Sequence, residues 1–206
     1  EFILSILLFV DATDVRGGLF GRNPRAAFRV LLIALPLSLA GAVLLGRWLL
    51  PGLPWAVLLL IACIVVPIDF APAAAILRDN RIPERVRNLL NVEAGYNDGI
   101  VSPVFLFAVA LAGAQSGAAP GTALRHALSG AAIAVVVGAL LGAVLAHLSN
   151  LARRRGLMTA RSRRVLLVVA PALSHGVSIG LHGNGFVAAF VCGIAFHYLY
   201  DNETLQ

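Results

Sequence analysis

Residues 88–113 read NLLNVEAGYNDGIVSPVFLFAVALAG, and this stretch decides the fold of the chain. A bilayer core about 30 Å thick is crossed by about 20 helical residues, so the stretch is long enough to span it. Its only charged side chains are Glu93 and Asp98. Acids within a membrane-crossing helix are rare and mark functional sites, so the stretch predicts both a membrane protein and the place where it acts.

The composition of the whole chain agrees with this interpretation. Hydrophobic residues make up 59% of it and charged residues 13%, whereas soluble domains have about 45–50% and about 25%. A soluble globular protein is therefore excluded. We predict an all-α membrane protein, a polytopic helical bundle in one domain over 1–206, with seven spans near 1–10 (truncated), 27–50, 55–77, 88–113, 127–149, 163–181 and 184–200.

All 16 basic residues are arginine, and they alternate between the predicted loops. The loops 11–29, 78–88 and 150–164 contain four, four and six, and the loops between them contain one or none. Cytoplasmic loops carry the basic excess, so these three are predicted to face the cytoplasm. The net charge of +6 therefore reports topology and does not indicate nucleic acid as a partner. Binding of anionic membrane lipid by the six-arginine loop is the alternative, which topology does not require.

Two prolines bracket a third acid in the span 55–77, within the run Val66-Pro67-Ile68-Asp69-Phe70-Ala71-Pro72. Proline removes a backbone donor and breaks a helix, and broken helices in transporters lie at ion sites near the membrane midplane. Asp69 is nine residues from Arg78, about 13–14 Å of helix, which places it near the bilayer centre. We therefore predict a broken helix near Asp69, with a structural role as a helix cap as the alternative.

The polar side chains of 88–113 share one broad face of a helix. At about 100° per residue, Glu93, Asn97 and Asp98 lie at about 0°, 40° and 140°. A carboxylate at mid-membrane costs at least about 2.5–3.5 kcal/mol, so these groups should face a cavity, a cation or a proton partner. Oxygen ligands suit hard cations such as Na⁺, Li⁺ or K⁺. Burial favours the protonated carboxyl and a neighbouring cation favours the carboxylate, so proton and cation would compete for one site.

The residues Asn91 to Gly99 resemble the signature N-x-E-S-G-x-N-D-G of monovalent cation/proton antiporters of the NhaP and eukaryotic sodium/proton exchanger type. Leu8–Ala12, Pro67–Asp69 and Gly183–Gly193 look like the same family, in family order. The resemblance implies one inverted-repeat portion of an antiporter fold and a homodimer. It also implies exchange by alternating access, in which a transport domain binds cation or proton and a dimerisation domain stays comparatively fixed.

The resemblance also assigns roles to the polar residues. Asp98 would be the main ligand of the transported Na⁺ and the proton carrier, and Asp69 and Glu93 further ligands. Asn97 would orient the site. The Asn97–Asp98 pair, in place of two aspartates, resembles the electroneutral branch, in which one proton exchanges for one cation.

Two positions depart from the family pattern. Ile68 and Ala94 stand where the family usually has threonine and serine, so two hydroxyl oxygens are missing. The backbone carbonyl of Ile68 at the break between Pro67 and Pro72, or water, would replace them. Glu1 lies ten residues before Asp11, about 15 Å by helical rise, and could also reach mid-membrane depth. Because the chain starts inside an apolar run, we expect it to be part of a longer protein.

The same residues are compatible with other functions. A cation channel or a regulatory membrane protein could use these acids as a filter. An intramembrane enzyme would need a nucleophile, and the adjacent Ser174 and His175 point about 100° apart, so no enzyme is predicted. His175 is the one histidine to suspect of pH sensing. No cofactor is expected, since no nucleotide fingerprint occurs, and the arginine-only, alanine-rich composition suggests a bacterial plasma membrane.

Overall fold

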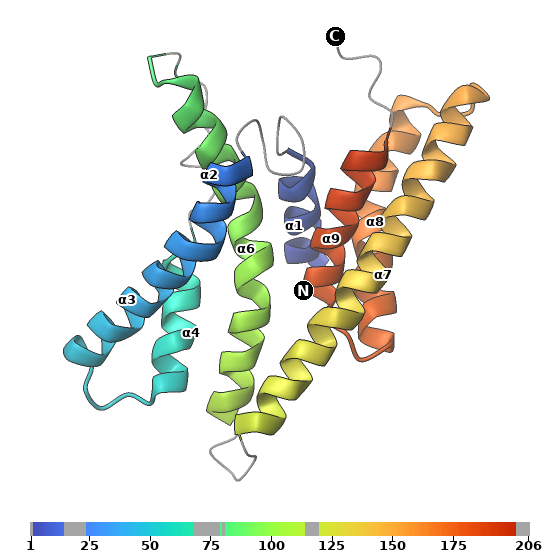
Figure 1. The fold of residues 1–206 in the computed structure, drawn as a ribbon. Coiled ribbons are helices and arrows are strands. Elements are labelled where there is room, and N and C mark those ends of the chain that lie inside the picture. The colour runs from blue at the N-terminus through green and yellow to red at the C-terminus, as the bar shows by residue number, and fades with distance from the viewer. Residues whose placement is uncertain (1, 15–23, 68–78, 80, 114–119, 201–206) are drawn as a thin grey trace. The chain divides into compact units, whose positions relative to one another are not determined.

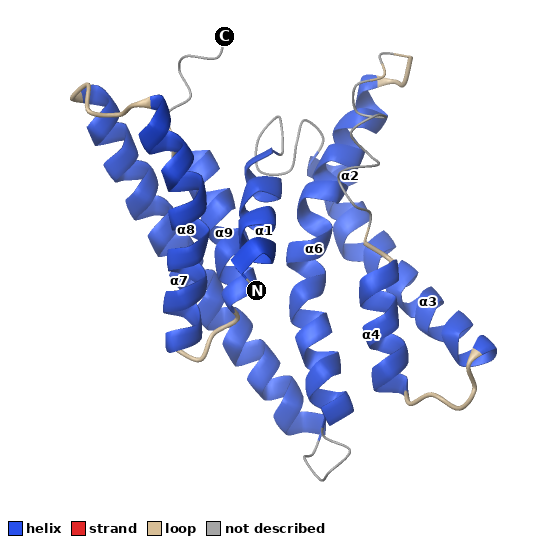
Figure 2. Cartoon of the chain, turned by 180° about the vertical axis from the view of Figure 1, so that it is seen from behind, coloured by secondary structure: helices blue, strands red, loops and turns tan. Residues whose placement is uncertain are grey.

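The computed structural model describes residues 2–14, 24–67, 79, 81–113 and 120–200 (Figure 1). Within these ranges every regular element is a helix, as Figure 2 shows. The chain divides into two compact units: unit 1 comprises Glu1–Asp14 with Gly130–Gln206, and unit 2 comprises Val15–Ser129. Each unit is described by itself.

Unit 2 begins with one long helical segment of three parts, α2 (Pro24–Arg29), η1 (Val30–Ala34) and α3 (Leu35–Leu49). The η1 part is a π-turn directly before Pro36, the second residue of α3. Proline has no N–H to donate to the preceding turn, and a widened turn accommodates that missing bond. The sequence predicts a span here but not this local change of helix type.

Unit 2 also contains α4 (Trp55–Val65) and α6 (Glu84–Gly113). They pack with α3 through a buried apolar core formed by Leu35, Leu39, Ala62, Cys63 and Val101. Cys63 is thus a packing residue. Van der Waals packing stabilises such contacts between membrane helices, because lipid tails are as apolar as the side chains. This core fixes α4 along the part of α6 that follows the predicted acidic face.

Unit 1 contains α1 (Phe2–Asp14), most of α7 (Pro120–Arg154), α8 (Ala160–Gly180) and α9 (Gly185–Leu199). Both views show α1, α8 and α9 side by side (Figures 1 and 2). The core of the unit is formed by Phe9, Ala146, Ala170, Cys192 and Phe196. Helix α9 is therefore the central element, since it supplies side chains to contacts with all three neighbours.

The fold class predicted from the sequence, an all-α membrane protein, is confirmed. Three helical segments are long and apolar enough to cross a membrane, and they cover Pro24–Leu49, Glu84–Gly113 and Leu124–Arg154. Large apolar side chains lie exposed on these helices, for example Trp48, which is 77% exposed. Such exposure suits contact with lipid and not with water.

The described helices overlap the predicted spans but differ from them in length. Helix α6 starts at Glu84 instead of 88, and α7 starts at Pro120 instead of 127. A helix continues beyond the membrane as long as its backbone bonds are satisfied, so hydropathy alone sets no helix end. The number of membrane crossings therefore stays a prediction.

The predicted break in the span 55–77 falls at the edge of the described residues. Helix α4 ends at Val65, Val66 still has helical backbone angles, and the chain bends at Val66 and Pro67. Ile68, Asp69 and Pro72 lie outside the described residues, as does Glu1.

Candidate ion site

Helix α6 holds the predicted polar residues within unit 2. Asn97 is fully buried, at 0% exposure, and Glu93 and Asp98 are half-buried. The backbone N–H of Asp98 donates to the Asn97 side-chain oxygen over 2.6 Å. That bond holds the side-chain oxygen of Asn97 against the backbone of Asp98. The two residues therefore form one polar group on the helix.

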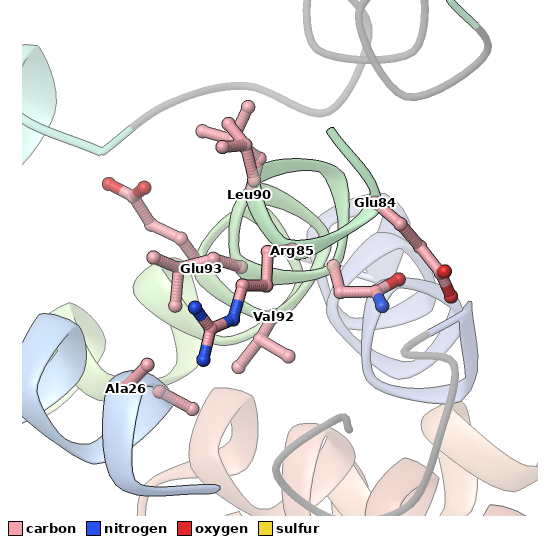
Figure 3. Close-up of a pocket in the computed structure, with 10 residues that line it drawn as sticks. Ala26, Glu84, Arg85, Leu90, Val92 and Glu93 are labelled. Atoms are coloured by element: carbon pink, nitrogen blue, oxygen red, sulfur yellow. The ribbon is translucent and has the colours of Figure 1, made fainter. Parts of the chain in front are cut away.

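A cavity of about 620 Å³ lies against the N-terminal half of α6. Figure 3 shows Glu93 and Arg85 on the side of α6 that faces Ala26 of α2, while Glu84 extends from the opposite side. The volume is many times what one water molecule needs, so a hydrated cation has room. The cavity is lined by Ala26, Ala27, Glu84, Arg85, Val86, Asn88, Leu89, Leu90, Val92 and Glu93.

Glu93 and Asp98 differ in their position relative to this cavity. Glu93 lines it, whereas Asn97 and Asp98 are not among its lining residues. Five residues along the helix correspond to about 7.5 Å of rise and about 140° of rotation. Glu93 therefore lies at the cavity, and Asp98 lies one to two turns farther along α6.

The end of α4 lies beside α6 just beyond Asp98. Val66 packs against the cluster that contains Val101, three residues after Asp98. Pro67 follows as a half-buried residue in the bend. Of the predicted site residues, Glu93, Asn97 and Asp98 are thus together on α6, and Pro67 is at the end of a helix packed on α6. The places of Ile68, Asp69, Pro72 and Glu1 remain predictions.

Two features of the site were not found from the sequence. Arg85 lines the same cavity as Glu93 and brings a positive charge to it. It had been counted with a loop, because helix α6 was expected to begin at 88. Pro103 lies inside α6 and cannot donate to the carbonyl of Gly99, the residue after Asp98. The Gly99 carbonyl oxygen therefore lacks the helical hydrogen bond from residue 103, and it lies next to Asp98 in the sequence.

Unit 1 contains a separate buried polar pair. The Ser5 hydroxyl and the His175 Nδ1 are 2.7 Å apart, and both side chains are buried. The imidazole also contacts the rings of Phe2 and Phe186. The Ser174 hydroxyl instead donates to the Pro171 carbonyl. Within the described ranges, the structure thus joins His175 to Ser5 and not to Ser174.

The described part of the chain holds no group of three or more His, Cys, Asp or Glu side chains that could bind a metal ion. The predicted set of three acids needs Asp69, which lies outside that part. Helix α6 therefore supplies two of the three predicted carboxylates, those of Glu93 and Asp98.

Comparison with known proteins adds an independent observation. The family model described as "Sodium/hydrogen exchanger, transmembrane" matches residues 1–206. An uncharacterised Na⁺/H⁺ exchanger of Escherichia coli is 31% identical over 107 residues, which are 51% of this chain and 20% of that protein. A Na⁺/H⁺ antiporter of Schizosaccharomyces pombe is 30% identical over 118 residues, 54% of this chain and 25% of its own.

The name of a third relative includes cations other than sodium. A sodium, potassium, lithium and rubidium/H⁺ antiporter of Bacillus subtilis is 32% identical over 127 residues, 56% of this chain and 18% of its own. The aligned part of this chain thus spans about a quarter or less of the length of these curated relatives. No solved structure matches the chain.

Proposed function

Because the chain belongs to the sodium/hydrogen exchanger family, we propose that it forms part of a secondary antiporter that exchanges a monovalent cation for H⁺ by alternating access. The match over the whole chain is the observation that carries this proposal. It agrees with the acids that the sequence places inside an apolar helix. The chain is an integral membrane protein, and we place it in a bacterial plasma membrane as part of a homodimer.

The cation in this proposal is held by Asp98, with Asn97 fixing the local geometry. The hydrogen bond between the Asp98 N–H and the Asn97 side-chain oxygen supports this role, because it limits the rotation of the amide. Asp69 completes the site as a second carboxylate, and the Gly99 carbonyl adds a neutral oxygen. A cation displaces the proton from Asp98 on one side of the membrane, and a proton displaces the cation on the other.

Glu93 has an entry role in this scheme. Its carboxylate lines the cavity together with Arg85, and the two opposite charges favour ions and water there over apolar side chains. A cation would meet Glu93 first and then move along α6 to Asp98. Loss of Glu93 should therefore weaken cation binding more than it lowers the maximal rate.

The division into two units supports transport by movement of one unit against the other. Glu93, Asn97 and Asp98 all lie in unit 2, so this unit would carry the ion. Unit 1 would contain the surface for dimerisation. Since Asn97 is neutral and pairs with a single aspartate, one cation would exchange for one proton, without net charge movement.

The proposal is tested with the full-length parent in inverted membrane vesicles carrying an inside-acid pH gradient. Addition of Na⁺, Li⁺ or K⁺ should dissipate the gradient with the wild type and not with Asp98→Asn. Asp79→Asn is the matched control, because it makes the same chemical change at a partly exposed carboxyl, paired with Arg81, before α6. Full-length protein that inserts correctly but gives no response to any cation would refute antiport.

The same vesicles separate antiport from a channel. A channel would pass the cation in response to an imposed membrane potential without any proton movement. An electroneutral antiporter should instead respond to the pH gradient and remain insensitive to the potential. Cation flux that follows the potential alone would therefore favour the channel.

A further inference from the structure

An apolar groove of about 530 Å³ lies between α3, α4 and α6 within unit 2. All the side chains that line it are apolar. Leu35, Leu39 and Val101 line it as members of the buried core. Pro36 and Leu44 also line it, and both are exposed. The groove is therefore open at the surface of the unit, and it suits a hydrocarbon chain and not a polar ligand.

The α3 wall of the groove leads to Arg47. Four residues of α3 that line the groove are Pro36, Ala40, Val43 and Leu44. At about 100° per residue, all four lie within about 60° of Arg47 around the helix, so they form one stripe with it. Pro36 and Arg47 are eleven residues apart, which is about 16 Å along the helix and close to half of the roughly 30 Å apolar core of a bilayer. The stripe therefore has the length of one leaflet and a positive charge at one end.

The α4 wall of the groove leads to the same arginine. Leu59 lines the groove, and Trp55 lies one turn before it on the same face of α4. The guanidinium carbon of Arg47 lies 5.6 Å from the centre of the Trp55 ring, and the guanidinium also donates to the Pro51 carbonyl. Figure 1 shows the connection between α3 and α4 at the end of unit 2 that also holds the C-terminal end of α6. Both walls therefore lead to one guanidinium held in a defined place.

The acids of unit 2 are all distant in sequence from this end of the groove. Residues 15–68 and 99–129 contain no Asp or Glu, and the five acids of the unit all lie between 69 and 98. A guanidinium has five N–H donors, of which the Pro51 carbonyl accepts only a part. A second copy of the chain, docked through the same surface, would bring a second arginine there and no acid. A phosphate group brings the complementary negative charge.

From these observations we propose that the groove of unit 2 binds an anionic phospholipid of the leaflet opposite the arginine-rich loops. The phosphodiester lies at Arg47 beside Trp55, and one acyl chain lies along the stripe from Leu44 to Pro36. Tryptophan is enriched at the level of the lipid head groups, which agrees with this depth. The lipid site goes beyond the proposed antiport, because it uses none of the acids of α6 and requires no transport.

Native mass spectrometry of the full-length parent in detergent tests the proposal. The protein is titrated with dioleoylphosphatidylglycerol, with dioleoylphosphatidylcholine, and with glycerol phosphate, which has no acyl chain. The wild type should retain phosphatidylglycerol preferentially. R47Q should bind it about fivefold more weakly, since this is the contribution of one basic residue near an anionic lipid. R125Q is the matched control and should bind like the wild type, because it removes an exposed arginine of the same unit that does not line the groove.

A second pair of variants tests the place of the acyl chain and leaves Arg47 intact. A40F puts a phenyl ring into the groove and should weaken phosphatidylglycerol binding. A110F makes the same change at an exposed position of α6 that does not line the groove, and it should leave binding unchanged. Because Ala40 is exposed, A40F should fold even if R47Q, which loses the bond to the Pro51 carbonyl, does not.

Three outcomes would overturn the proposal. The first is phosphatidylglycerol binding that is equal in the wild type, R47Q and A40F, or no tighter than phosphatidylcholine binding. The second is binding of glycerol phosphate as tight as that of the lipid, which would indicate a soluble phosphate ligand. The third is a change from dimer to monomer in A40F without any loss of bound lipid, which would indicate that a second copy occupies the groove. The titration uses no ion gradient, so its result does not depend on whether the parent exchanges cations.

Discussion

The contact between α7 and α9 gives the sharpest test of the packing in unit 1. Ala134, Gly138, Gly142 and Ala146 follow each other at intervals of four residues on α7, and the two alanines are fully buried. A Cβ added at Gly142 would lie 2.5 Å from the Cys192 carbonyl oxygen of α9. Small residues at this spacing let membrane helices approach closely, so we predict that Gly142→Ala separates α7 from α9.

The size of the effect follows from these distances. The added Cβ would also lie 2.8 Å from the Ala195 Cβ, whereas carbon atoms pack best at about 3.5–4.0 Å, so the helices must move apart by about 1 Å. Such overpacking costs roughly 1–3 kcal/mol. Alanine regains about 1 kcal/mol through its higher helix propensity. The net destabilisation should be roughly 0–2 kcal/mol by these two estimates, and roughly 1–3 kcal/mol relative to a glycine-to-alanine change that meets no clash.

The measurement is SDS-induced unfolding of the detergent-solubilised protein, followed by circular dichroism. Gly41→Ala is the matched control, because Gly41 lies inside α3 and an added Cβ there meets nothing within 4 Å. It should leave stability unchanged or raise it. Gly138→Ala combined with Gly142→Ala should cost less than the sum of the two, because one helix displacement relieves both clashes. A Gly142→Ala protein as stable as Gly41→Ala would refute the close packing.

Of three further predictions of stability, the first two use the same SDS unfolding assay and the third uses thermal unfolding. Asn184→Ala should cost about 1 kcal/mol, because the side chain caps α9 with bonds to two backbone N–H groups, and Asn184→Ser should retain most of that stability. Ser5→Ala should cost about 1–3 kcal/mol by removing a buried partner of His175, and adding His175→Phe should recover part of it; further loss in the double variant would contradict this pairing. The bonds from Arg81 hold the pKa of exposed Asp79 below its ordinary value of 3.8. This small contribution is present at neutral pH and lost as pH falls through the lowered pKa, so wild type and Asp79→Asn should converge in thermal stability only in strong acid.

The helical class and the main polar residues could be predicted from the sequence because they depend on short-range patterns. An apolar run of span length identifies a membrane helix without reference to its neighbours. The spacing of Glu93, Asn97 and Asp98 likewise depends only on helix geometry. The alternation of arginines predicts which loops face the cytoplasm, and that assignment stays a prediction. Helix ends were less well predicted, as at Glu84 and Pro120, because they depend on local hydrogen bonding as well as hydropathy.

Contacts between distant residues were not accessible in this way. Nothing in the surroundings of Ser5 points to a histidine 170 positions later. The sequence likewise does not indicate that Glu93 and residues of α2 line one cavity. Nor does it indicate that Arg153 and Arg163 both lie near the ring of Tyr200. Each contact exists only because separate helices pack in a particular register.

The sequence by itself thus determined the environment of the chain, its helical class and the acids that must be shielded from lipid. These follow from hydropathy and from the cost of charge in a low-dielectric medium, which act on each segment independently. The tertiary structure alone decided that Glu93 lines the cavity and that the Ser5 hydroxyl lies beside His175. It also decided that two arginine side chains lie near the Tyr200 ring. The physical reason is that side-chain packing is close and specific, so these choices depend on the joint fit of several helices and not on any one of them.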